Sequence, residues 1–446
     1  MKNFGKLFLS VMVLLLSFLV FVGCGPAEDE DTDEVKVIKV WVHKSEAEDE
    51  GIVYSTIAEL FNEQQLKTAD GTRILKMKLE FKNSSDTLQT AINAEILSGG
   101  LPDIVAVDAP NIAAYADAGI LAPIDQYLTT DITSSYVDSV IEQSTIDGKL
   151  YALSGMDAPT GMYFNKDLLK QVGYDEEDFG TVTNPWSWLD VMEAMVALKA
   201  ANLEYRIKLN LGFGGDEGVM YLYSSLIYSS GGSFFGANEV VDGALNSSNS
   251  IKGIKMLEMF FNPDDDGEPW VYNGSNTDAL AGGECAFEIH GPWNISTIKK
   301  NYNTFIPSYG IMPMPVYEDE TTKGTPVAGC GSWGFGVTVN SSDPASAAIA
   351  VAYITGVTGS QLMYESIGTF PTHKSLLNDL TGFQTGALGS LATILQEIAT
   401  PRPKMINYPK VSSSYSKIIE YIETMNGTTE YNLEDYIDTQ VVQIDN

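Results

Sequence analysis

The sequence contains few basic residues. Its 446 residues include 26 Lys and Arg against 59 Asp and Glu, which gives a formal net charge of −33 at pH 7. Nucleic acids and anionic membrane surfaces attract basic patches, so this balance argues against both as partners. It favours a soluble protein that meets neutral or cationic ligands, although a solubilising surface alone accounts for the charge more simply.

Catalytic and metal-binding motifs are missing. The chain has no G-x-S-x-G elbow, no H-E-x-x-H and no P-loop lysine. Its three histidines, His43, His290 and His373, stand far apart and without metal-ligand spacing. These absences favour a protein that is not an enzyme and holds no metal. A glycoside hydrolase needs only two acids, so that alternative stays open in so acidic a chain.

Long apolar runs are also scarce, and the longest stands at the N-terminus. Lys2 and Lys6 precede an apolar stretch over residues 7–22, which is the pattern of a secretory signal. The stretch ends Phe-Val-Gly-Cys24 and resembles the lipobox of bacterial lipoproteins, in which the cysteine is lipidated. We therefore predict a lipoprotein signal peptide over 1–23 and a solvated acidic tether over 24–34. A plain cleaved signal, with Cys24 incidental, is the alternative.

Two further cysteines, Cys285 and Cys330, complete the set of three. Outside the cytoplasm they could form one disulfide bond. Two buried free thiols are at least as compatible with their small-residue surroundings.

The first hundred residues after the tether alternate between strand and helix patterns. Strand patterns cover 35–42, 74–81 and 101–107, and helical spacing of apolar residues separates them. The order β-α-β-α-β predicts a doubly wound parallel unit. A chain of this length exceeds one ordinary core, so we expect two lobes.

Asp108 follows the third of these strands. At the carboxyl end of a strand its carboxylate could accept hydrogen bonds from ligand hydroxyls. It could equally cap the helix that begins near Ile112.

Residues 282–293 read Gly-Gly-Glu-Cys-Ala-Phe-Glu-Ile-His-Gly-Pro-Trp. Alternation from Cys285 to His290 predicts a half-buried strand, which Gly291 and Pro292 stop. Trp293 then stands just past the carboxyl end of a strand, where open α/β folds bind ligands. The alternative is that Trp293 fills the core.

Residues 329–336 satisfy a G-x-G-x-x-G count. A strand pattern over 335–339 follows where a dinucleotide site needs a helix, so that interpretation fails. We expect the glycines to let the backbone approach a bound molecule and to display Trp333.

Taken together, the motifs resemble the extracellular solute-binding proteins of bacterial ABC importers, specifically the family 1 carbohydrate binders. The segments that carry the resemblance run in the family's order over nearly the whole mature chain. They are Cys24, 101–104 with Asp108, 115–119, 148–151, 163–167, 185–188, 283–293, 329–336 and 402–403.

The resemblance implies an α/β fold of two discontinuous lobes joined by a multi-strand hinge, the type II periplasmic-binding-protein architecture. It places the N-terminal lobe at 35–156 and 311–354, and the C-terminal lobe at 157–310 and 355–446. The hinge crossings are expected at 156–158, near Tyr309 and near Ile354.

The resemblance also implies the roles of individual residues. Trp293 would stack on a sugar ring, Trp333 would supply a second aromatic face, and Asp108 would accept bonds from hydroxyls. Four further candidates lie at strand-end loops: Trp41, His43, Lys44 and Asp86.

The implied function is an extracytoplasmic receptor that captures a sugar or oligosaccharide and delivers it to ABC transporter permease subunits. We expect a monomer without a cofactor, anchored through Cys24 on the periplasmic side or the outer face of the cell membrane. Three alternatives remain: a binder of a cationic solute such as a polyamine, a secreted glycoside hydrolase, and a purely structural lipoprotein.

Overall fold

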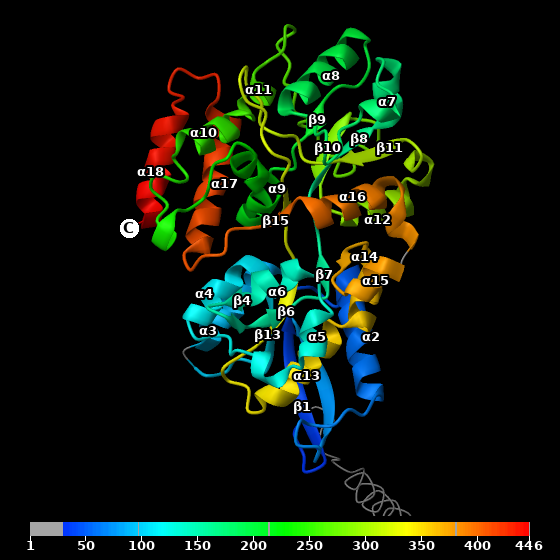
Figure 1. The fold of residues 1–446 in the computed structure, drawn as a ribbon, viewed down its shortest axis with the longest axis vertical. Helices are drawn as coiled ribbons and strands as arrows, with labels where there is room; N and C mark the ends of the chain where they lie inside the picture. Colours follow the sequence, from blue (N-terminus) through cyan, green and yellow to red (C-terminus); the bar gives the residue numbers. More distant parts are fainter. Residues whose placement is uncertain (1–29, 97, 213–214, 380, 446) are drawn as a thin grey trace, which may run out of the picture.

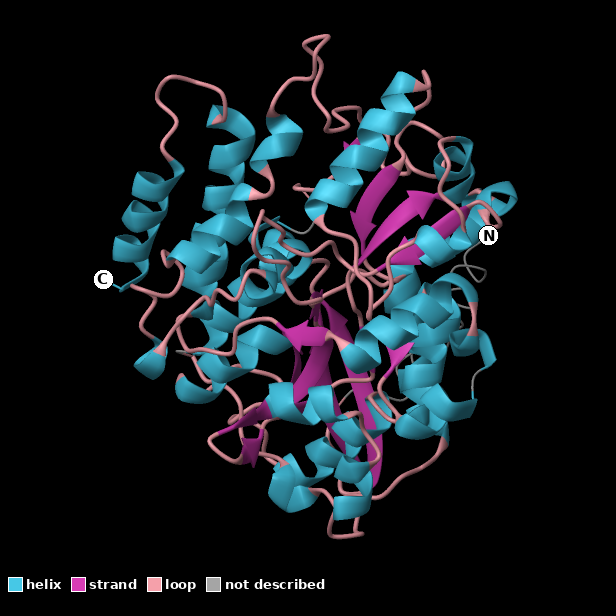
Figure 2. Ribbon diagram, turned by 45° about the horizontal axis from the view of Figure 1, so that its top comes forward, coloured by secondary structure: helices cyan, strands magenta, loops and turns pink. Residues whose placement is uncertain are grey.

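A computed structural model describes residues 30–445, apart from 97, 213–214 and 380 (Figure 1). The predicted signal peptide, Cys24 and the first part of the tether lie outside the described residues. Figures 1 and 2 show two α/β lobes, one above the other, with several chain segments running between them.

The first lobe is built on a five-stranded sheet with the order β2-β1-β3-β13-β6. The first three strands are parallel, and β13 joins them antiparallel. Helices α2 (Asp49–Glu63) and α3 (Ser85–Ile96) connect the parallel strands, which confirms the predicted β-α-β-α-β unit. The strands are β1 (Val35–Val42), β2 (Ile74–Phe81), β3 (Ile104–Asp108), β6 (Ala152–Leu153) and β13 (Trp333–Val337).

Burial explains why this sheet forms. All five residues of β3 are buried, as expected for a parallel strand covered on both faces. Helix α2 buries one face, including Ile57 and Phe61, in the same core as Ile38 and Val40 of β1. Each fully buried aliphatic side chain contributes roughly 1.5–3 kcal/mol.

The second lobe is built on a four-stranded sheet with the order β11-β8-β10-β9. Strand β10 is antiparallel to β8 and parallel to β9. These strands are β8 (Gly161–Asn165), β9 (Ile207–Lys208), β10 (Phe287–His290) and β11 (Tyr309–Met312). The core of this lobe takes in side chains of α8 (Trp188–Ala200), α9 (Gly215–Ser229), α17 (Tyr408–Met425) and α18 (Leu433–Asp445).

Two short two-stranded sheets lie where the chain passes between the lobes. Strand β7 (Met156–Asp157) pairs with β14 (Phe370–Pro371), and β12 (Ala328–Cys330) pairs with β15 (Ala399–Pro401). The fold is therefore the predicted pair of discontinuous lobes joined by several strands.

The exact limits of the lobes remain a prediction. Helix α14 (Val357–Ile367), which those limits place in the C-terminal lobe, buries Met363 in the core of the first sheet.

The remaining helices and strands complete the chain: α4 (Ile112–Asp117), α5 (Thr130–Ser134), α6 (Asp138–Ser144), β4 (Thr145–Ile146), β5 (Lys149–Leu150), α7 (Lys166–Gln171), α10 (Ser248–Lys255), α11 (Glu258–Phe261), α12 (Trp293–Asn301), α13 (Pro344–Ile354), α15 (Lys374–Asp379) and α16 (Gly386–Glu397).

Strand β10 differs from the prediction in one respect. Glu288 on its supposed solvent face is only 1% exposed, so the strand is buried on both faces. The Glu288 carboxylate lies 3.4 Å from Lys208 Nζ and accepts a hydrogen bond from Asn210, which compensates its burial.

Cys285 and Cys330 are both buried free thiols, so the disulfide alternative is wrong.

Within the described part of the chain, no single helix has the length and apolar character to cross a membrane. One bent pair of helices, α13 and α14, passes such a test by length and composition alone.

The crossing strand β12 packs against α9 so closely that it needs glycine. A Cβ on Gly329 would lie 2.3 Å from the carbonyl oxygen of Tyr221 and 3.0 Å from Ser224 Oγ. We expect Gly329→Ala to destabilise the protein by about 1–3 kcal/mol, because backbone must shift to make room. Urea unfolding measures the loss.

The matched control is Gly212→Ala, since a Cβ at the exposed Gly212 meets open space. Equal stability of the two variants would contradict the close packing of β12 on α9.

Candidate functional site

Asp108 and Trp333 face each other across two neighbouring strands of the first sheet. Asp108 ends β3 and is only 7% exposed, and Trp333 begins β13 directly opposite it. The antiparallel register therefore brings together the carboxylate and the aromatic ring that the sequence placed 225 positions apart.

The Asp108 carboxylate is bound by Arg402, which follows β15. Arg402 Nη1 lies 2.8 Å from Asp108 Oδ2, and Nη2 donates to Oδ1, so the contact is bidentate. Nη1 also lies 2.8 Å from the Glu217 carboxylate at the start of α9. Asp108 occupies the N-cap position of the short 3-10 turn Ala109–Asn111 that leads into α4, but its side chain makes no capping hydrogen bond.

Glu217 completes this cluster from the second lobe. Tyr408 at the start of α17 donates a 2.6 Å hydrogen bond to the carboxylate that Arg402 holds. Burial raises the pKa of Glu217, although the Arg402 charge opposes the rise. One guanidinium therefore serves two carboxylates from different lobes.

His43 supports the ring of Trp333. The two rings are stacked, with centroids 3.6 Å apart and planes 7° apart. His43 is 2% exposed, and its Nε2 lies 3.3 Å from the Glu50 carboxylate of α2. Burial alone would raise the pKa of Glu50, but the neighbouring His43, with Lys44 and Tyr54, holds it at about 2.

Trp293 lies in the second lobe as the first residue of α12. It is half-buried at the edge of the core, so it does not fill the core as a buried plug. Its ring stacks on Tyr221, with centroids 5.8 Å apart and planes 29° apart, and meets His290 edge-on. A Cβ on Gly291 would lie 2.2 Å from the Trp293 ring, so the Gly-Pro turn must carry glycine.

Tyr221 links the two halves of the site. Besides stacking on Trp293, its ring lies 5.9 Å from the Arg402 guanidinium. A chain of contacts thus runs from Trp333 and Asp108 of the first lobe through Arg402 and Tyr221 to Trp293 of the second.

Three sequence candidates are not part of this chain of contacts. Trp41 is 7% exposed and covered by Lys82, whose Nζ lies 3.8 Å from the ring centroid. Lys44 lies 3.4 Å from Glu50, and Asp86 is exposed in the first turn of α3.

Sequence reasoning missed Arg402, Glu217, Tyr221 and Tyr408 as site residues. The Pro-Arg-Pro-Lys stretch was a visible signal for Arg402, since an arginine between two prolines stands on a stiff, extended segment. No local pattern marks the other three, because only the fold brings α9 and α17 to the ends of the first sheet.

The arrangement offers aromatic faces, carboxylates and one guanidinium, which suits recognition of hydroxyl-bearing molecules. Among the described residues, no group of three or more His, Cys, Asp or Glu could hold a metal ion.

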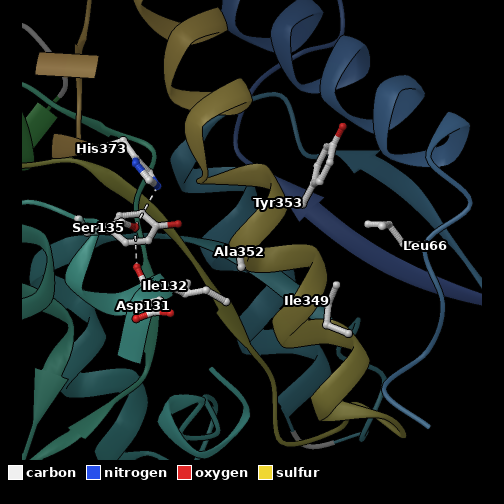
Figure 3. Close-up of a pocket in the computed structure, with 9 residues that line it drawn as sticks. Leu66, Asp131, Ile132, Ser135, Ile349, Ala352, Tyr353 and His373 are labelled. Carbon is white, nitrogen blue, oxygen red and sulfur yellow. Dashed lines mark hydrogen bonds between the residues drawn. The ribbon is translucent and has the colours of Figure 1, made fainter. Parts of the chain in front are cut away.

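A separate pocket of about 430 Å³ lies elsewhere in the first lobe (Figure 3). Its walls are mainly apolar, from α5, α13 and Leu66, and Ser135 Oγ lies 3.0 Å from His373 Nε2 at one side. Of the residues named in the sequence analysis, only His373 lines this pocket.

His290 beside Trp293 makes stability depend on pH. Burial, with a smaller contribution from the Lys208 charge, lowers the pKa of His290 from 6.5 to about 4, although the hydrogen bond with Gly291 opposes the shift. Between pH 6.5 and about 4, His290 binds a proton in the unfolded chain but not in the folded chain. The free energy of unfolding therefore decreases as pH falls through this range. We expect His290→Asn to lose less stability than the original chain between pH 7.5 and pH 5, measured by urea unfolding.

Comparison of each protein with itself at pH 7.5 controls for the substitution. An identical loss in both proteins would show that His290 takes up its proton equally in the folded and unfolded states.

Comparisons with known proteins fit this geometry. The galactooligosaccharide-binding protein of Bacillus subtilis (strain 168) is 21% identical over 366 residues, 78% of this chain and 78% of that protein. The maltodextrin-binding protein MdxE of the same organism is 23% identical over 351 residues, 76% of this chain and 77% of that protein.

A solved structure shares the fold. The solute-binding protein of an ABC transporter from Thermotoga lettingae, bound with α-D-tagatose, matches with a TM-score of 0.72 at 16% identity. The match covers 92% of this chain and 98% of that chain.

The family model for bacterial extracellular solute-binding proteins matches residues 48–360. The chain therefore belongs to the family of bacterial extracellular solute-binding proteins, which are binding proteins that act outside the cytoplasm.

Proposed function

We propose that this protein is a receptor that captures a sugar or oligosaccharide outside the cytoplasm and delivers it to an ABC importer without making or breaking a bond. The relatives support the ligand class, because their names give galacto-oligosaccharides and maltodextrins. Transport follows from closure of the two lobes on the ligand, which changes the surface that the permease subunits meet.

The observation that carries the proposal is that each lobe contributes one tryptophan, Trp333 or Trp293, to a chain of contacts through Asp108, Arg402 and Tyr221. His43 covers one face of Trp333, and Tyr221 backs Trp293, so both rings are held rigidly. Sugars present apolar C–H faces that match aromatic rings, and their hydroxyls match carboxylates. Asp108 retains acceptor capacity beyond its two bonds to Arg402 and can still serve a hydroxyl.

The charge of the cluster does not favour a cationic solute. The Arg402 guanidinium forms ion pairs with both Asp108 and Glu217, so a positive charge stands between the two carboxylates at the centre of the site and would repel a polyamine.

The remaining expectations belong to the same proposal. Cys24 would carry the lipid anchor, and residues 24–34 would tether a monomeric receptor to the membrane. The N-terminal lobe would comprise 35–156 and 311–354, and the C-terminal lobe 157–310 and 355–446. Trp41, Lys44 and Asp86 would contact ligand only if strand-end loops rearrange on binding.

A thermal-shift screen tests the ligand class. A ligand that binds only the folded state stabilises it by about 2.7 kcal/mol at a hundredfold excess over Kd. We expect one or more maltodextrins or galacto-oligosaccharides to raise the melting temperature, polyamines to leave it unchanged, and Trp293→Ala to reduce the sugar-induced shift.

Trp270→Ala is the matched control, because Trp270 is also half-buried in the second lobe but contacts Tyr205 outside the candidate site. A shift with polyamines alone, abolished by salt, would contradict the proposal. Turnover of an oligosaccharide by the purified protein would identify a glycoside hydrolase instead.

A further inference from the structure

The segment that begins at the last residue of β15 reaches from the second lobe to the first at two points. It reads Pro401-Arg402-Pro403-Lys404, and Met405 and Tyr408 just beyond it are fully buried in the second core. Its two prolines fix their own φ angles and hold Arg402 extended, which keeps the segment stiff. We call residues 401–404 the clasp segment.

Arg402 makes the first contact. Its guanidinium is held on its own side by Glu217 of α9, and it binds Asp108 of β3 with both terminal nitrogens. The Arg402 and Asp108 side chains are 5% and 8% exposed, so the pair lies out of water. Gly331 makes room for it, since a Cβ there would lie 2.5 Å from Arg402 Nη2.

Lys404 makes the second contact. Its Nζ donates to the carbonyl oxygens of Glu142 and Thr145, at 3.1 and 3.0 Å. These carbonyls stand at the C-terminal end of α6, which packs Val140 into the first core. The last carbonyls of a helix have no partner within the helix and carry partial negative charge, so a lysine there is favourable.

Both contacts join the second lobe to the first. Opening the hinge would part Arg402 from Asp108 and Lys404 from α6. A buried ion pair that loses one partner leaves an uncompensated charge until water reaches it. Another ion pair across the lobes, Lys300 of α12 with Asp49 of α2, is 3.7 Å long with side chains 73% and 61% exposed, and such exposed pairs contribute little.

We propose that the clasp segment is a ligand-independent latch that sets the equilibrium between open and closed forms. Arg402 and Lys404 favour the closed form before any solute binds. The solute then needs to supply less free energy to hold the lobes together, which raises its apparent affinity.

Small-angle X-ray scattering of the purified chain without ligand tests the latch. Lys404 is exposed, so Lys404→Met leaves the fold intact while it removes the bonds to α6. We expect Lys404→Met and Arg402→Met each to shift the radius of gyration to a larger value, and the double variant to shift it further. Lys300→Met is the matched control and should leave it unchanged.

Because the scattering measurement needs no sugar, its failure and the failure of the proposed function are distinguishable. Circular dichroism of each variant separates opening from unfolding. An unchanged radius of gyration in Lys404→Met and in a folded Arg402→Met variant would overturn the latch. An equal shift in Lys300→Met would overturn it too, because loss of any ion pair between the lobes would then open them, and the clasp segment would have no special role.

Discussion

The buried guanidinium of Arg402 is the contact on which the arrangement of the two lobes depends. It donates a bidentate pair of hydrogen bonds to Asp108 of one lobe and a single hydrogen bond to Glu217 of the other, with Tyr221 beside it. A charged group out of water requires such compensation. Arg402 therefore connects the end of β3 in the first sheet to α9 in the second lobe. This connection fixes the position of Trp333 relative to Trp293.

Local patterns in the sequence predicted most of the elements that support this site. The strand at 35–42 matches β1, and the strand at 74–81 matches β2, because apolar residues alternate with lysines over part of each segment. Trp293 and Asp108 were found for a similar reason, because each stands beside the turn that ends a strand. Trp293 comes just after a Gly-Pro turn, and Asp108 comes just before an Ala-Pro turn.

Contacts between distant segments could not be predicted in this way. Asp108 meets Arg402 across 294 positions, and His43 meets Trp333 across a sheet whose order the sequence does not state. Helix α14 and strand β14 were missed because short elements of mixed polarity lack a clear period. The sequence also misjudged β10, since an acid such as Glu288 predicts a solvent face unless its partner Lys208 is known.

A crystal structure grown with an oligosaccharide that raises the melting temperature would test the central claim most directly. The account predicts one sugar between the lobes, with a ring against Trp293, Trp333 close by, and Arg402 still bound to Asp108. A sugar bound on the outer surface, or in the first-lobe pocket near His373, would contradict it.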